Sequence, residues 1–190
     1  MTHPTEVVDA LYEAADEGNP VTAERIADHL DRRGIGALLL VPAAIEMTPI
    51  GGIPGLPTLL AATVALFAAQ ILIGREDLWL PGILGRRTVD ADRLRTAADW
   101  LRPIAEWADR HLGRHMPVLT TPPASRIAAL AIILLCCTVP ALELVPFAST
   151  LPMAAAALFG LALLTQDGRV MALAWTATLG AAYGVWALWP

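Results

Sequence analysis

Lysine is absent from this 190-residue sequence, and charge of either sign is scarce over most of its length. Eight Asp/Glu and three Arg lie in residues 1–34, and nine Arg and seven Asp/Glu lie in residues 75–126. The rest of the chain contains only four charged side chains, Glu46, Glu143, Asp167 and Arg169. Hydrophobic residues make up 56% of the chain, above the roughly 45–50% that is usual for soluble domains. This segregation of charge is typical of an integral membrane protein.

The sequence also lacks the features that mark nucleic-acid-binding proteins, common enzyme classes and secreted proteins. A net charge of −5 without a dense basic patch argues against nucleic acid as a partner. The sequence has no Ser/His/Asp grouping, phosphate-binding loop or complete metal-ligand set, so we expect no enzymatic activity, cofactor or metal. The adjacent Cys136 and Cys137 lie in an apolar run and are expected to pack rather than to bridge. The N-terminus lacks a basic region followed by an apolar one, so no cleavable signal peptide is expected.

Composition divides the chain into five parts. Residues 1–34 are expected to form short cytoplasmic helices. Residues 35–74 and 127–166 are expected to form two membrane repeats, separated by the Arg-rich segment 75–126, and residues 167–190 to form a C-terminal transmembrane helix. The arginines place both the N-terminus and residues 75–126 in the cytoplasm by the positive-inside rule. The prediction is a multi-pass protein of the bacterial inner membrane.

The Arg-rich segment contains an amphipathic helix that Asp90 is expected to cap. Its apolar stripe consists of Leu94, Ala97, Ala98, Leu101, Ile104, Ala105, Ala108 and Leu112, with Trp100 and Trp107 beside it. Pro103 is expected to kink or divide the helix, because it removes a backbone hydrogen bond. Two interpretations stay open: the helix lies in the membrane interface, or it packs against protein on the aqueous side.

The two membrane repeats are related by a shift of 92 positions. This shift superposes Pro54 on Pro146, Thr58 on Thr150 and Phe67 on Phe159, together with several Ala and Leu residues. Each repeat has a short apolar helix, a Pro-broken turn with one acid (Glu46 or Glu143) and a second helix rich in small residues. The expected fold class is therefore an all-α membrane protein with two helix–broken turn–helix repeats, an amphipathic linker and a C-terminal transmembrane helix.

Broken, duplicated apolar segments are typical of re-entrant hairpins in transporters. The eleven apolar residues before Glu46 span about 16 Å, roughly half of a bilayer core, which favours re-entry for the first repeat. The second repeat is also compatible with an ordinary surface loop. Parallel and inverted orientations of the repeats both stay open.

A series of motifs resembles the ExoD family of exopolysaccharide-synthesis-associated membrane proteins. The series comprises Pro54–Leu60, Gln70, Gly74–Arg75, Trp79–Pro81, Trp100–Leu101 and Gln166–Gly168, and the likeness covers roughly residues 5–185. The resemblance implies a membrane location and a role in the cell envelope, and it supplies no catalytic residues.

Two functions follow as hypotheses. A transporter-like protein, acting as a homodimer, would bind or move an ion, lipid or lipid-linked sugar between the repeats. Its site would draw on Glu46, Thr48, Gly51, Gly52, Gly55, Thr58, Gln70, Glu143 and Thr150, with Thr58 and Thr150 as helix caps. A scaffold for the exopolysaccharide-synthesis machinery would instead use a partner or lipid-bilayer surface made by Trp79, Pro81, Trp100 and Trp107.

Overall fold

A computed structural model describes residues 3–31, 34–48, 53, 55–74, 81–112, 120–143 and 148–188 of the chain. Helices dominate these residues, as the apolar and amphipathic patterns predict. The described part also contains one short antiparallel pairing that the sequence did not predict, between β1 (Val21–Thr22) and β2 (Thr88–Val89).

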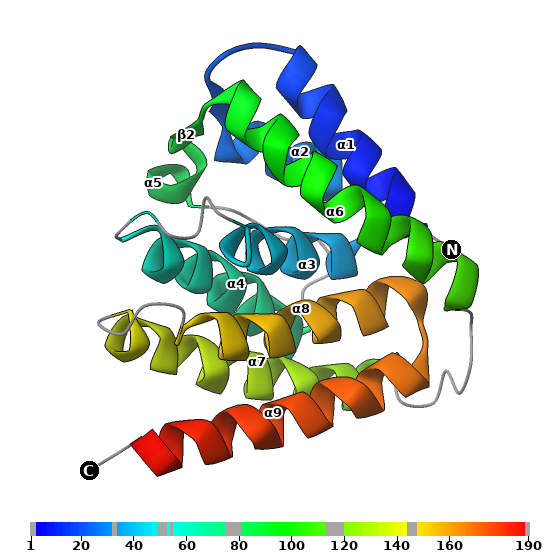
Figure 1. Cartoon of the computed structure of the whole chain (residues 1–190), viewed down its shortest axis with the longest axis vertical. Coiled ribbons are helices and arrows are strands. Elements are labelled where there is room, and N and C mark those ends of the chain that lie inside the picture. Colours follow the sequence, from blue (N-terminus) through cyan, green and yellow to red (C-terminus); the bar gives the residue numbers. More distant parts are fainter. Residues whose placement is uncertain are drawn as a thin grey trace.

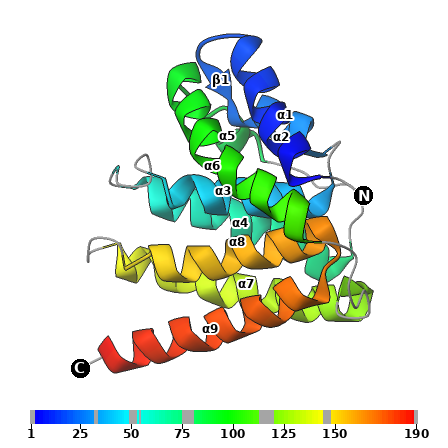
Figure 2. The same ribbon diagram turned by 45° about the vertical axis from the view of Figure 1, so that its right-hand side comes forward.

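The elements form two regions that are distinct in both views (Figures 1 and 2). One, here called the charged layer, contains α1 (Pro4–Asp16), α2 (Ala23–Asp31), α5 (Gly82–Gly85), α6 (Ala91–His111) and the two strands. The other, here called the apolar bundle, contains α3 (Ile35–Glu46), α4 (Leu56–Ile73), α7 (Pro122–Leu142), α8 (Thr150–Thr165) and α9 (Gly168–Leu188). The charged layer therefore combines two segments that helices α3 and α4 separate in sequence.

Local capping sets where helices of the charged layer begin. The side chain of Asp90 accepts a hydrogen bond from the Asp92 N–H at 3.0 Å, which confirms the predicted cap of α6. Thr22 similarly accepts from the Arg25 N–H at 3.4 Å at the start of α2. Helix α6 continues without interruption through Pro103, so the proline does not divide the helix, and the alternative that it kinks the helix stays a prediction.

The apolar stripe of α6 is buried against α1. Leu94 and Ala98 are 1% and 0% exposed, and Leu11 of α1 is fully buried. Trp100, Ile104 and Trp107 are instead about half exposed, at 48%, 49% and 52%. Packing against protein thus accounts for most of the stripe, and Ile104, which the sequence assigned to it, belongs to a separate outer row with the two tryptophans.

Charged side chains pair with one another in this layer. Every ion pair among the described residues lies there, including Arg95 with Asp16 at 2.7 Å and Arg102 with Asp9 at 3.6 Å. Tyr12 donates a hydrogen bond to Asp99, and this bond raises the pKa of Tyr12 above its ordinary value. Exposed ion pairs of this kind are screened by water and contribute little, so the buried contact of α1 with α6 is the main stabilising element of this layer.

The apolar bundle is built from two antiparallel helix pairs, α3 with α8 and α4 with α7. Helices α3 and α8 touch backbone to backbone at Gly36 and Gly160. A Cβ atom at Gly36 would lie 2.4 Å from the Leu164 nitrogen, and one at Gly160 would lie 2.6 Å from the Leu40 nitrogen. Small residues permit this close approach, which is common between membrane helices.

Two described helices are long and apolar enough to cross a membrane by length and composition. They are Leu56–Ile73 (α4) and Pro123–Leu142 (in α7), each with a mean hydropathy of 2.1. Helix α9, which the sequence favoured as a full span, is not one of these two, and its assignment stays a prediction. Large apolar side chains point outward from α7 and α9, among them Ile127, Leu134, Leu173 and Leu179. Such faces suit a lipid environment.

Candidate functional site at a junction of helix ends

The helix ends that precede the two broken turns lie at the same end of the apolar bundle. Glu46 is the last residue of α3, and Glu143 directly follows α7. Because α3 is antiparallel to α8 and α7 is antiparallel to α4, each acid reaches the N-terminus of a helix from the other half. We call the five residues that make these contacts, Glu46, Ser149, Glu143, Gly55 and Thr58, the junction.

Glu46 is almost completely buried, at 4% exposure. The Ser149 hydroxyl donates a hydrogen bond of 2.6 Å to its Oε1, and Ser149 is 5% exposed. The second carboxyl oxygen, Oε2, is buried and has no hydrogen-bond partner in the described part of the chain. Burial of a polar atom without a partner costs about 1–3 kcal/mol, so this oxygen needs an explanation.

Glu143, the acid at the end of α7 in the other half, has both carboxyl oxygens hydrogen bonded. Its Oε1 accepts from the Gly55 N–H, and its Oε2 accepts from the Thr58 hydroxyl. The carboxylate also lies at the N-terminus of α4, where the helix dipole favours negative charge. Glu143 is therefore well explained as a structural link between the halves.

The structure corrects the predicted roles of the two threonines. Gly55 and Ser149, rather than Thr58 and Thr150, occupy the N-cap positions of α4 and α8. Gly55 has φ 85°, a left-handed conformation that glycine adopts without strain. Thr58 is the third residue of α4, in its first turn, where it contacts Glu143, and Thr150 is the first residue of α8.

Other predicted site residues lie outside the junction. Gln70 is buried near the opposite end of α4, about 18 Å along the helix from Thr58. Thr48, two residues after Glu46, is buried, and its hydroxyl donates to the Ile45 carbonyl at 2.7 Å. Pro81 is half-buried just before α5. Gly51, Gly52 and Trp79 lie outside the described residues.

Sequence reasoning missed Ser149. A small hydroxyl residue directly before an apolar run is a signal for a helix start, and this signal was available in the sequence. Its pairing with Glu46, 103 residues away, was not. No group of three or more His, Cys, Asp or Glu side chains is placed to hold a metal within the described ranges.

The chain is similar to one protein family. No curated protein and no solved structure matches the chain. The family model described as "Exopolysaccharide synthesis, ExoD" matches residues 5–187, almost the whole sequence. That family association and the two apolar helices agree with a membrane location. The chain belongs to the ExoD family and is thereby associated with exopolysaccharide synthesis.

Proposed function

We propose that this protein is a transporter-like membrane protein that binds a proton or a monovalent cation at Glu46, between its two halves. The observation that carries the proposal is the contrast between the two junction acids. Both oxygens of Glu143 accept hydrogen bonds, whereas Oε2 of Glu46 is buried without a described partner. A buried acid in a membrane protein is expensive unless it is neutralised, and it commonly marks an ion or proton pathway.

Ser149 gives the site a defined geometry. Its hydroxyl holds Oε1, so only Oε2 is left to take up a proton or to coordinate a cation. The carboxylate also lies beside the N-terminus of α8, whose dipole offsets part of the cost of the negative charge. Both contacts favour the charged form of Glu46 and so oppose the cost of its burial.

The two halves support a duplicated, transporter-like architecture. Helices α4 and α8 both end at a residue with positive φ, Gly74 and Gln166, which are 92 positions apart like Thr58 and Thr150. The twelve residues of α3 span about 18 Å, less than the roughly 30 Å of a bilayer core. We infer two parallel hairpins whose first helices end at the same end of the bundle, the first hairpin being re-entrant. A homodimer would enclose the pathway better than one such short chain.

Proton flux tests the proposal directly. Purified protein is reconstituted in liposomes containing a pH-sensitive dye, and a pH gradient is applied. We expect a flux that Glu46→Gln abolishes and Glu106→Gln leaves unchanged, because Glu106 lies on the exposed face of α6. Repeating the assay with Na⁺, with K⁺ and with neither ion distinguishes the substrates, because a flux of protons alone does not require either cation. A flux of equal size in the wild type and in Glu46→Gln would contradict the proposal.

The second candidate function is a membrane-bound scaffold, and the outer row of α6 favours it. Trp100, Ile104 and Trp107 are about half exposed and follow one another at helical spacing on one face. An exposed row of this composition is suited to a partner protein or to the membrane interface. Loss of exopolysaccharide in cells that carry Trp100→Ser and Trp107→Ser, with normal flux in liposomes, would favour this function over transport.

A further inference from the structure

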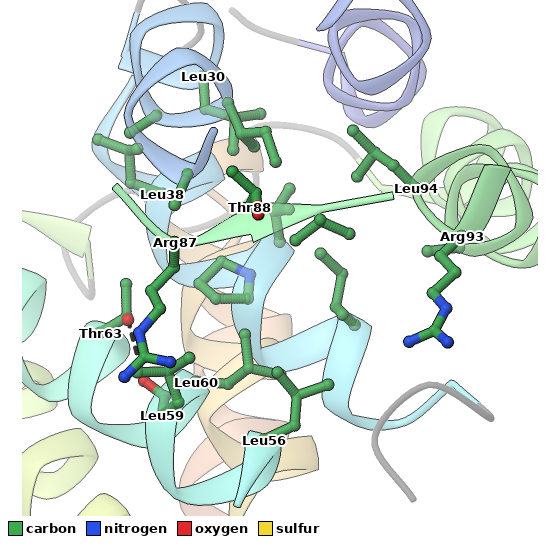
Figure 3. Close-up of a pocket in the computed structure, with 18 of the residues that line it drawn as sticks. Leu30, Leu38, Leu56, Leu59, Leu60, Thr63, Arg87, Thr88, Arg93 and Leu94 are labelled. Atoms are coloured by element: carbon green, nitrogen blue, oxygen red, sulfur yellow. Dashed lines mark hydrogen bonds between the residues drawn. The ribbon is translucent and has the colours of Figure 1, made fainter. Parts of the chain in front are cut away.

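A cavity lies between the charged layer and the first half of the apolar bundle. It has a volume of about 340 Å³, and its walls come from α2, α3, α4, β2 and the start of α6 (Figure 3). Much of the lining is aliphatic or aromatic, including Ile26, Leu30, Leu38, Leu60 and Phe67. An engineered apolar cavity of roughly 150 Å³ is large enough to bind benzene. The cavity is partly open to the surface, and its size and largely apolar lining suit an apolar ligand.

The polar side chains of the lining are few, and two of them are already engaged. They are Thr63, Arg87, Thr88, Asp90 and Arg93. The Thr63 hydroxyl donates to the Leu59 carbonyl of its own helix at 3.0 Å. The Asp90 carboxylate accepts the capping hydrogen bond of α6. Arg93 stands on the far side of the cavity from Arg87 and directs its guanidinium away from the apolar cluster (Figure 3).

Arg87 is the charged group that lies along the apolar wall. In Figure 3 its side chain extends toward α4 and reaches Leu59, Leu60 and Thr63. The Ala23 N–H donates to the Arg87 carbonyl at 2.8 Å, which fixes the backbone beside the paired strands β1 and β2. The Arg87 guanidinium forms no ion pair or hydrogen bond with any other residue that the structure describes. The cavity therefore has an apolar interior and an uncompensated, exposed cation at its edge.

We propose that this cavity binds the hydrocarbon chain of a phosphate-bearing amphiphile and that Arg87 binds the phosphate. Guanidinium and phosphate groups form charge-assisted, bidentate hydrogen bonds. The volume is at the lower end of the roughly 300–1,000 Å³ of ligand pockets, which suits part of one chain rather than a complete two-chain lipid. The orientation follows from the position of the cavity, with the chain against α3 and α4 and the head group at the charged layer.

The inference does not depend on transport, because the cavity residues are separate from the five junction residues. Two sources share the required chemistry: a phospholipid, with linear acyl chains, and a polyisoprenyl phosphate, with branched ones. Both present an anionic phosphate on an apolar chain. Dodecyl phosphate and farnesyl phosphate are soluble probes of the two chain types, and dodecanol is a probe without the phosphate.

Native mass spectrometry of the full-length protein in a neutral detergent provides the test. We expect saturable binding of at least one phosphate probe, with dodecanol binding much more weakly. Arg87→Gln is expected to weaken binding of that probe roughly tenfold or more, since it removes a charged hydrogen-bond donor. Arg86→Gln is the matched control, because Arg86 is an exposed neighbour that does not line the cavity. A preference for dodecyl or farnesyl phosphate identifies the source.

A second variant tests the cavity independently of charge. Ala27 lines the cavity from α2, and Ala27→Phe is expected to fill part of it and to reduce binding of the probe that the wild type binds. Thermal unfolding in the same detergent identifies any variant that is not folded. If Ala27→Phe does not fold, Leu60→Trp, which fills the cavity from α4, replaces it. The proposal is overturned if dodecanol binds as tightly as dodecyl phosphate, or if folded Arg87→Gln binds like the wild type. Binding in detergent requires no gradient, so its outcome is separate from the flux result at Glu46.

Discussion

Gly36 of α3 and Gly160 of α8 lie where the two halves of the apolar bundle meet backbone to backbone. A Cβ atom on either residue would lie less than 3 Å from main-chain atoms of the facing helix, as the 2.4 Å and 2.6 Å separations indicate. The Glu46–Ser149 hydrogen bond joins the same two helices at their other ends. Helices α3 and α8 therefore contact each other at both ends, by close backbone packing at one end and by a buried hydrogen bond at the other.

This contact predicts a large effect for a small substitution. Gly36→Ala or Gly160→Ala should reduce the free energy of unfolding by about 1–3 kcal/mol, because the facing backbone cannot rotate away as a side chain can. The control is Gly180→Ala in α9, where no atom lies within 4 Å of the added methyl group. That variant should be neutral or stabilising by up to about 1 kcal/mol. Thermal unfolding in detergent measures all three, and equal midpoints for Gly36→Ala and Gly180→Ala would argue against this helix crossing.

The buried contact at the other end predicts coupling between Ser149 and Glu46. Ser149→Ala should destabilise the protein by about 1–3 kcal/mol, because it leaves both buried oxygens of Glu46 without a donor among the described residues. In a Glu46→Leu background the same change should cost much less, since no buried carboxylate remains. A double-mutant cycle by thermal unfolding gives the coupling energy, which is expected to be about 0.5–3 kcal/mol. Strict additivity of the two changes would show that the hydrogen bond contributes nothing.

Much of the fold follows from local patterns in the sequence. The periodicity of residues 91–111 and the capping residue Asp90 predict α6, and the long apolar runs predict the helices of the bundle. These signals are local because they depend on the 3.6-residue helical repeat and on hydrogen bonds to the nearest turn. The charge distribution likewise anticipates the separation of the charged layer from the apolar bundle.

The partners of these helices are not encoded locally. The apolar stripe of α6 is equally compatible with a lipid surface and with a protein surface, and only the tertiary structure shows Leu94 and Ala98 buried in a helix that packs on α1. The proline at position 103 lies in an unbroken helix because this packing outweighs one lost hydrogen bond. The Glu46–Ser149 and Glu143–Thr58 contacts join residues 103 and 85 positions apart, beyond the reach of any spacing rule. The duplication itself stays a prediction.

The native cysteines predict a labelling pattern that tests the membrane location. Cys137 is exposed on α7, within the apolar segment Pro123–Leu142, whereas Cys136 is buried. In membrane vesicles a charged, impermeant maleimide should leave Cys137 unmodified, because lipid covers this face. The same reagent should modify it after solubilisation in a denaturant. Asp9→Cys, on the exposed surface of α1, is the positive control, and it should be labelled in vesicles that have been permeabilised so that the reagent reaches both sides. Rapid labelling of Cys137 in intact vesicles would contradict a lipid-facing α7.

The two faces of α6 predict opposite responses to substitution. Leu94 is buried at the edge of the cavity beside α2, α3 and α4, so Leu94→Ala should destabilise the protein by about 2–5 kcal/mol through lost apolar contacts and an enlarged cavity. Trp100 is half exposed on the outer row, so Trp100→Ser should change the free energy of unfolding by no more than about 0.5 kcal/mol in detergent. Both values come from thermal unfolding of the full-length protein. The comparison is informative because tryptophan has the larger apolar side chain. If burial rather than size decides the loss of unfolding free energy, the leucine substitution causes the greater loss. A larger loss for Trp100→Ser than for Leu94→Ala would mean that the tryptophan row, rather than the stripe against α1, holds α6 in place.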